Sequence, residues 1–185
     1  GGMGVAVSNW RLAREVAQRG KVGVVSGTAI DAVVARRLQL GDPGRHVQRA
    51  MAAFPWPDMV KRIWDRYFVP GGKAENEPFR QMPMLSVNMG RPAVELLLVA
   101  NFVEVFLAKE GHDGTVGINY LEKIQIPTLP SLLGAMLAGV NVVLMGAGIP
   151  MAIPGAMDCL AQWQEAEIQI NVEGDSQGEP CVHRL

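Results

Sequence analysis

The chain has 185 residues, 49% of them apolar, and a formal net charge of −1 from 17 basic and 18 acidic residues. This length suffices for one domain with a sizeable core, and the balanced charge argues against a nucleic-acid-binding protein, which usually carries a basic excess. No apolar stretch reaches the roughly 18 residues of a membrane span, and the start lacks the regions of a secretory signal. We therefore expect a cytoplasmic protein that binds neither nucleic acid nor membrane.

The first forty residues predict a glycine turn, a helix, a strand and a second helix. Gly1-Gly2-Met3-Gly4 forms the turn, Ser8 is the expected N-cap of the first helix, and Gly20 ends that helix. Residues 22–26 have the apolar character of a buried strand, and residues 30–40 return to helical periodicity. A glycine turn of this kind normally follows a strand, so we expect an N-terminal piece of the fold to be missing.

The middle of the chain predicts helices and one long loop. Residues 42–54 and 57–68 predict two helices, and residues 70–92, rich in Gly, Pro, Asn and Met, predict a loop that covers the fold. The apolar stretch that follows permits two interpretations. It is either a helix to residue 99 with a strand over residues 101–108, or a single helix throughout.

The most informative stretch, residues 115–150, predicts a strand, a loop, a helix, a strand and a glycine-rich loop. Residues 116–120 and 140–145 are short runs rich in Val, Ile and Leu, which indicate buried strands. The first run carries Asn119 near its end, and the second is followed by Gly146-Ala147-Gly148. Parallel α/β folds bind ligands at the carboxyl ends of their strands. We therefore expect a small-molecule site here.

The alternation of strands and helices sets the expected fold class. Residues 153–163 predict a helix, residues 167–172 predict a strand, and the polar residues 173–185 are expected to fray. Such alternation predicts a parallel α/β sheet with right-handed crossovers. With four or five strands, the chain corresponds to roughly the first half of a (β/α)8 TIM barrel with helical insertions, or to a small open sheet.

Few polar residues stand out as candidates for chemistry. The amide of Asn119 can donate and accept at once, which suits the edge of a flavin or pyrimidine ring, or a bond to neighbouring loop backbone. Lys123 could place charge near a cofactor or form a solvated ion pair with Glu122. His112 precedes a strand, on the side of a barrel that serves stability, which argues against a general base. No metal-ligand spacing and no Gly-x-Ser-x-Gly motif appears, so we expect no metal and assign no catalytic residue.

Three segments carry a resemblance to a known family. They are GGMGVAVSNWRLAREVAQRGKVGVVSGTAID at the start, the link GDPGRHVQRAMAAFPWPDMVKRIWDRYFVPGGKA, and the central FVEVFLAKEGHDGTVGINYLEKIQIPTLPSLLGAMLAGVNVVLMGAGIP. Over residues 1–172 the chain resembles the N-terminal part of the nitronate monooxygenase (2-nitropropane dioxygenase-like) family of FMN-dependent α/β-barrel enzymes. It is similar to the branch that includes the flavin-dependent enoyl reductases of bacterial polyunsaturated fatty acid and polyketide synthases.

The resemblance implies a flavoprotein oxidoreductase with FMN as cofactor and a small-molecule or acyl-thioester substrate. By this analogy the turn contacts the flavin through its backbone, an Asn bonds the isoalloxazine, and the last loop lies beside the ring. The implied cofactor-binding residues are Gly2, Met3, Gly4, Asn119, Gly146 and Ala147. The family's Gly-Gly-His segment, which supplies a catalytic base, and its phosphate-binding loops have no counterpart here. The resemblance thus implies an N-terminal fragment that lacks its base.

Two other functions remain open. A non-catalytic half-barrel would leave a strand edge open and would associate with itself, as a homo-oligomer, or with another chain. A barrel enzyme of the nucleotide-oxidising dehydrogenase type would present a catalytic Cys in a loop. Cys159 falls in a predicted helix, which disfavours this last interpretation.

Overall fold

Three parallel strands form the central sheet of this protein. The computed structural model describes residues 4–170 and 181–185. The strands are β1 (Gly23–Ser26), β2 (Val116–Leu121) and β3 (Val142–Gly146), hydrogen-bonded in the order β1-β2-β3. A mixed α/β fold with a parallel sheet is therefore confirmed, and its membership of a barrel stays a prediction.

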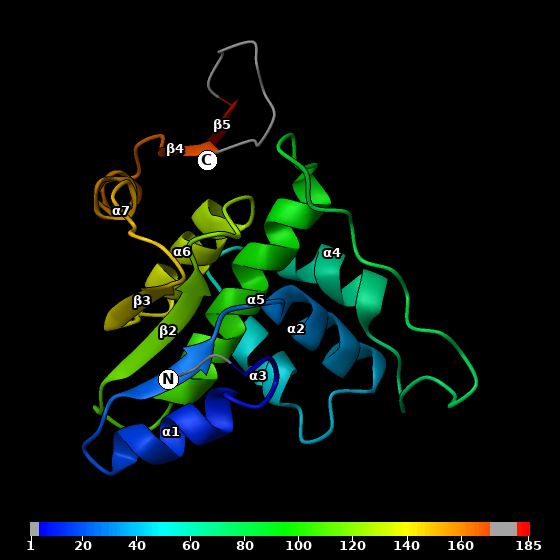
Figure 1. The fold of residues 1–185 in the computed structure, drawn as a ribbon. Helices are drawn as coiled ribbons and strands as arrows, with labels where there is room; N and C mark the ends of the chain where they lie inside the picture. The colour runs from blue at the N-terminus through cyan, green and yellow to red at the C-terminus, as the bar shows by residue number, and fades with distance from the viewer. Residues whose placement is uncertain (1–3, 171–180) are drawn as a thin grey trace.

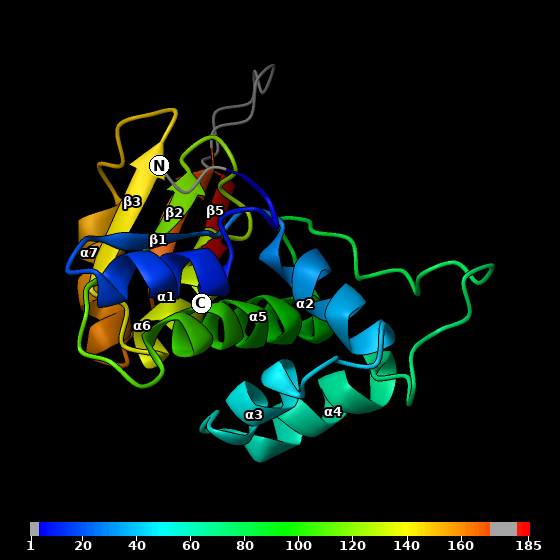
Figure 2. The same ribbon diagram turned by 90° about the horizontal axis from the view of Figure 1, so that it is seen from below.

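Helices pack on one face of this sheet and on one another (Figure 1). They are α1 (Trp10–Gln18), α2 (Ile30–Gln39), α3 (His46–Ala52), α4 (Pro57–Tyr67), α5 (Arg91–Lys109), α6 (Thr128–Leu137) and α7 (Ile153–Ala161). Figure 2 shows α1 and α5 below the strands, with α6 beside α5 and with α2, α3 and α4 farther out. No helix within residues 4–170 and 181–185 is long and apolar enough to cross a membrane.

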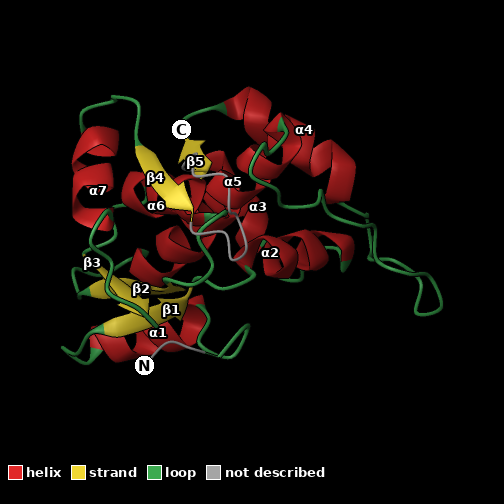
Figure 3. Ribbon diagram, turned by 45° about the horizontal axis from the view of Figure 1, so that its top comes forward, coloured by secondary structure: helices red, strands yellow, loops and turns green. Residues whose placement is uncertain are grey.

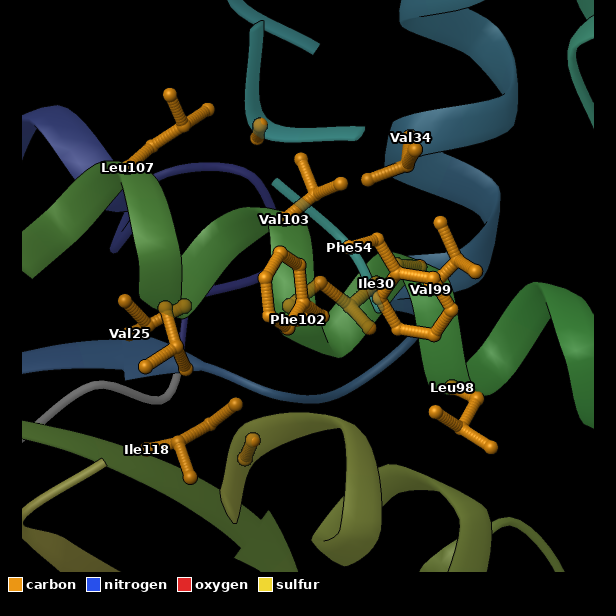
Figure 4. Packing of buried hydrophobic residues seen from close by; sticks show 14 of the residues in the cluster. Val25, Ile30, Val34, Phe54, Leu98, Val99, Phe102, Val103, Leu107 and Ile118 are labelled. Atoms are coloured by element: carbon orange, nitrogen blue, oxygen red, sulfur yellow. The ribbon is translucent and has the colours of Figure 1, made fainter. Parts of the chain in front are cut away.

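The register of the strands gives the sheet two different faces. Val25 pairs with Ile118, and both lie fully buried between the sheet and α5 (Figure 4). Because side chains alternate along a strand, Ser26 and Asn119, which also pair with each other, belong to the opposite face. We call that opposite face, with Ser26, Asn119, Val142 and Leu144, the second face. Its β3 side chains are uncovered: Val142 is 38% exposed and Leu144 is 36% exposed.

The apolar stretch before β2 is one helix, α5, so the interpretation as a helix followed by a strand is wrong. The helix contacts α1, α2, α3, α4, α6 and the sheet. Because neighbours surround it, apolar residues occur on all its sides and the usual helical stripe is lost. Its buried acids, Glu95 and Glu104, are paired with arginines of other elements.

Two helices begin later than the sequence predicts. The N-cap of α1 is Asn9 rather than Ser8, because the Asn9 side chain accepts hydrogen bonds from two backbone N–H groups of the first turn. The helix predicted from residue 42 begins at His46. The Asp42 carboxylate instead accepts bonds of 3.0 and 2.8 Å from backbone N–H groups of α3. In both places a side-chain oxygen accepts hydrogen bonds from backbone N–H groups that have no partner within the helix.

The last described strands form a separate antiparallel hairpin of β4 (Glu167–Ile170) and β5 (Cys181–Arg184) (Figure 3). The expected fraying is therefore wrong for residues 181–184, and β4 does not extend the parallel sheet. Backbone pairing holds β5 despite its polar sequence, since Ile168 and His183 pair and are both buried. Residues 173–180 of the predicted tail lie outside the described residues.

Candidate functional site

The carboxyl ends of the three parallel strands meet at one edge of the sheet. Asn119 lies between Ser26 of β1 and Leu144 of β3 in the register, and Leu121 pairs with Gly146. The structure thus brings Asn119 and Gly146, which the sequence predicts separately, onto neighbouring strands at the same edge. We call this edge, with Ser26, Asn119 and Gly146, the carboxyl edge.

The N-terminal glycine turn is tied to the same edge. The carbonyl of Gly4 accepts hydrogen bonds from the backbone N–H groups of Val7, at 3.0 Å, and Ser8, at 2.9 Å. The carbonyl of Ser8 in turn accepts a 2.8 Å bond from the N–H of Ser26. Gly4 is therefore linked through Ser8 to the end of β1. The other two residues of the predicted turn contact, Gly2 and Met3, lie outside the described residues.

Polar side chains of the carboxyl edge are largely removed from water. Asn119 is 7% exposed, and Ser26 is 5% exposed. The Oγ of Ser26 is buried and has no hydrogen-bond partner among the described residues. A buried hydroxyl without a partner costs free energy, so the Ser26 hydroxyl is a group that a polar ligand at this edge could satisfy.

The loop after β3 makes a close contact with the loop after β2. The N–H of Glu122 donates a 2.8 Å bond to the carbonyl of Gly146, and Ala147 has a positive φ of 62°. A Cβ on Gly148 would lie 2.8 Å from the Cβ of Glu122, so a larger residue there would displace Glu122. The Nε2 of Gln125 donates to the other oxygen of Glu122 at 3.3 Å. Glu122 is thus held at the carboxyl edge.

Lys123 does not share that arrangement. Its side chain is exposed, and among the described residues it forms no ion pair with Glu122.

A cavity of about 240 Å³ opens beside the loops after β2 and β3. It is lined by Glu122, Gln125 and Met145 together with residues of the segment before α7. Space for a ligand therefore adjoins the carboxyl edge.

His112 lies at the opposite edge of the sheet, before β2. Its Nε2 lies 2.7 Å from the carbonyl of Ala108, and its Nδ1 accepts a 3.0 Å bond from the N–H of Gly114. Both ring nitrogens are therefore engaged by backbone, away from the carboxyl edge.

Cys159 lies in α7 as predicted, and both cysteines are free thiols. No group of metal-ligating side chains occurs in the part of the chain that the structure describes.

Comparisons with known proteins give no further assignment. The chain matches no protein-family model, no curated protein and no solved structure. The resemblance to the nitronate monooxygenase family therefore stays a prediction from the sequence motifs.

Ser26 is the residue of the carboxyl edge that sequence reasoning missed. It ends a buried strand, directly before Gly27-Thr28, in the way that Asn119 stands near the end of β2. The same sequence pattern, a polar residue at the end of an apolar run, could therefore have identified both Ser26 and Asn119 as candidate site residues. Only the register shows that the two side chains belong to one face.

Proposed function

We propose that this chain is the ring-binding part of an FMN-dependent oxidoreductase of the nitronate monooxygenase or enoyl reductase type. Its substrate would be a small molecule or an acyl thioester. The observation that carries the proposal is the row of Ser26, Asn119 and the Gly146 loop at the carboxyl edge of a parallel sheet. Ligands of parallel α/β folds bind at this edge. The resemblance to the nitronate monooxygenase family is the reason for choosing FMN among such ligands.

The residues at the edge fit the isoalloxazine ring. Asn119 places an amide at this edge, and the Ser26 hydroxyl, which has no hydrogen-bond partner among the described residues, can supply a bond to the ring edge. The exposed Val142 and Leu144 offer apolar surface beside them. When bound, FMN would supply the hydride- or electron-accepting chemistry, while these residues orient the ring and keep water away. We assign no phosphate loop among the described residues, so the proposal concerns the ring.

Flavin retention by the purified chain tests this proposal. FMN is added, free dye is removed, and the visible spectrum is recorded. Retained bands that are shifted from those of free FMN are expected. Replacing Asn119 by Ala removes one hydrogen bond, which contributes about 0.5–1.5 kcal/mol, so the FMN affinity should fall roughly two- to tenfold. A folded chain that retains no flavin would overturn the proposal, as would an unchanged affinity in the variant.

Asn141 provides a matched control at the other end of the sheet. Its Oδ1 accepts bonds of 2.8 Å from Lys109 Nζ and 3.0 Å from the N–H of Val116. Asn141→Ala removes the same kind of group far from the carboxyl edge. Its FMN affinity should equal that of the unchanged chain once circular dichroism has shown that the variant is folded.

A second candidate function, a non-catalytic half-barrel that associates with itself or with another chain, is favoured by the uncovered second face. Parallel sheets normally have both faces covered, whereas Val142 and Leu144 are exposed. In the described sheet β1 and β3 each have one neighbour, so each leaves an edge. Sedimentation should then show an oligomer without flavin that Leu144→Lys dissociates. A monomer at every concentration would count against this function.

A further inference from the structure

A second cavity, of about 310 Å³, lies on the helical side of the sheet. Its walls come from the turn after β1, the start of α2, α5 and the turn before α6, and Met82, Pro83 and Leu85 complete the lining. Tyr120, the neighbour of Asn119 in β2, lines it, so the cavity and the second face are on opposite sides of that strand. Its volume is at the lower end of the range of small-molecule sites, about 300–1,000 Å³.

The lining is mostly apolar and includes one charged side chain, that of Asp31. Leu85, Leu97 and Ile124 supply aliphatic surface, and Met82 supplies an adaptable side chain. The polar groups of Tyr120 and Thr128 are already engaged. The Tyr120 hydroxyl lies 2.8 Å from Asn101 Oδ1 and 3.0 Å from the carbonyl of Ser131, and Thr128 Oγ1 donates to the carbonyl of Ile124 at 3.1 Å.

Asp31 is the charged residue of this lining. Its side chain is in the first turn of α2 and is only 8% exposed. Burial raises the pKa of its carboxyl, and the backbone N–H groups of Asp31 and Ala32 oppose that rise. No cation among the described residues forms an ion pair with it. A carboxylate removed from water without a cation is costly, and a bound cation relieves that cost.

We propose that this cavity binds a small aliphatic amine, with its ammonium group against Asp31 and its chain among Leu97, Tyr120 and Ile124. The charge of Asp31 selects the head group: an ammonium gains a charge-assisted hydrogen bond, an alcohol gains a neutral one, and a carboxylate is repelled. The apolar walls of the cavity favour an aliphatic hydrocarbon chain on the bound amine. This site is separate from the proposed flavin site, and either can exist without the other.

Three six-carbon probes with different head groups test the proposal on the full chain by isothermal titration calorimetry. Hexylammonium should bind at least tenfold more tightly than hexanol, and hexanoate should bind most weakly. Equal or tighter binding of hexanol or hexanoate would overturn the assignment of a cation site. Absence of binding by hexylammonium would overturn the proposal as a whole.

A matched pair of substitutions tests the role of the charge. Asp31→Asn should lower the affinity for hexylammonium to within about twofold of that for hexanol, and should leave hexanol binding unchanged. Asp58 occupies the same position in the first turn of α4 but is exposed, so Asp58→Asn should change neither affinity. An unchanged hexylammonium affinity in Asp31→Asn would contradict the proposal.

A cavity-filling variant keeps the proposal testable if Asp31→Asn does not fold. Ile124 lines the cavity and is partly exposed, so a larger side chain there narrows the cavity without disturbing the core. Ile124→Trp should abolish binding of hexylammonium and of hexanol alike. Binding as tight as that of the unchanged chain would show that the amine binds elsewhere, against the proposal.

Discussion

Glu104 connects three helices through its two carboxylate oxygens. It lies in α5 and is 1% exposed; one oxygen accepts a 3.0 Å bond from the N–H of Trp10 in α1, and the other pairs with Arg37 of α2. Burial raises the pKa of Glu104, and Arg37 opposes the rise. Arg37 therefore compensates a charge that would otherwise be buried alone.

Removing that compensation should be strongly destabilising. Arg37→Met is expected to lower the free energy of unfolding by about 3–5 kcal/mol, because it leaves a buried carboxylate unpaired. Urea unfolding followed by circular dichroism measures the change. The control is Arg19→Met, which breaks the exposed pair with Glu15 and should cost under about 1 kcal/mol. Equal losses in the two variants would contradict this account.

Glu110 predicts a dependence of stability on pH. The side chain of Arg49 donates bonds of 2.7 and 2.9 Å to its carboxylate and holds the pKa of Glu110 below the ordinary value of 4.5. A lowered pKa in the folded state means that the pair stabilises the fold above pH 4.5. That contribution is lost as the pH falls through the folded-state pKa.

Glu110→Gln isolates this contribution. At pH 7 the variant should be less stable by up to about 1 kcal/mol, the range for a partly exposed pair. The difference should shrink once the pH drops below 4.5 and vanish in stronger acid. Urea unfolding at a series of pH values measures it. A difference that stays constant or grows towards acid would rule out this role of Glu110.

At the scale of elements, α5 and α6 cross with their backbones in close contact. A Cβ on Gly134 of α6 would lie 2.1 Å from the carbonyl oxygen of Leu98 in α5. Gly134→Ala should therefore destabilise the protein by about 1–3 kcal/mol, because the helices must separate. Gly155→Ala in α7 is the control: no atom lies within 4 Å of that Cβ, and the variant should be about 0.5–1 kcal/mol more stable. Thermal or urea unfolding measures the change in stability of each variant. Equal changes in the two variants would contradict the close packing of α5 against α6.

Two kinds of element were predicted well from the sequence: a helix with one buried side, α4, and a short apolar run that is buried on both faces, β2. The helix predicted over 57–68 is α4, and the strand predicted over 116–120 is β2, each within a residue at either end. The failure at α5 has a physical cause, since surrounding neighbours remove the stripe that distinguishes a helix from a buried strand. β5 was missed because its polar residues carry no strand pattern, while its pairing with β4 is a backbone property.

For the candidate site, the sequence predicts which residues lie at strand ends but not which of them face one another. Asn119 was predicted from its place near the end of one apolar run and Gly146 from its place after another, and the structure shows that both lie at the carboxyl edge. The pairing of Ser26 with Asn119 depends on the register of β1 and β2, which residues far apart in the chain determine. The cavity at Asp31 likewise requires α2, α5 and residues 82–85 to meet.

At the scale of the whole molecule, the β4–β5 hairpin should open before the rest of the fold. A two-stranded hairpin is marginally stable by itself, and α7 is its principal helical neighbour. The amides of Ala166 and Leu185, which bond each other's carbonyls at 3.0 Å, should exchange with deuterium at least about tenfold faster than those of Val99 and Phe102 in α5. Hydrogen exchange measured by NMR tests this order. Equal protection would mean that the hairpin unfolds only with the core.

The pairing of β1 with β2 also affects how the chain is made. About 90 residues separate Gly23 from its partner Val116, and a ribosome adds roughly 5–20 residues per second. During synthesis, roughly 5–20 seconds therefore pass between the synthesis of β1 and that of β2, which is the only strand partner of β1 in the described sheet. Over that interval its apolar residues have α1 as their nearest cover. The nascent chain thus exposes an unpaired strand edge for longer than many small domains need to fold. Such an edge can pair with other chains, so a chaperone would protect the chain from aggregation most effectively at this stage.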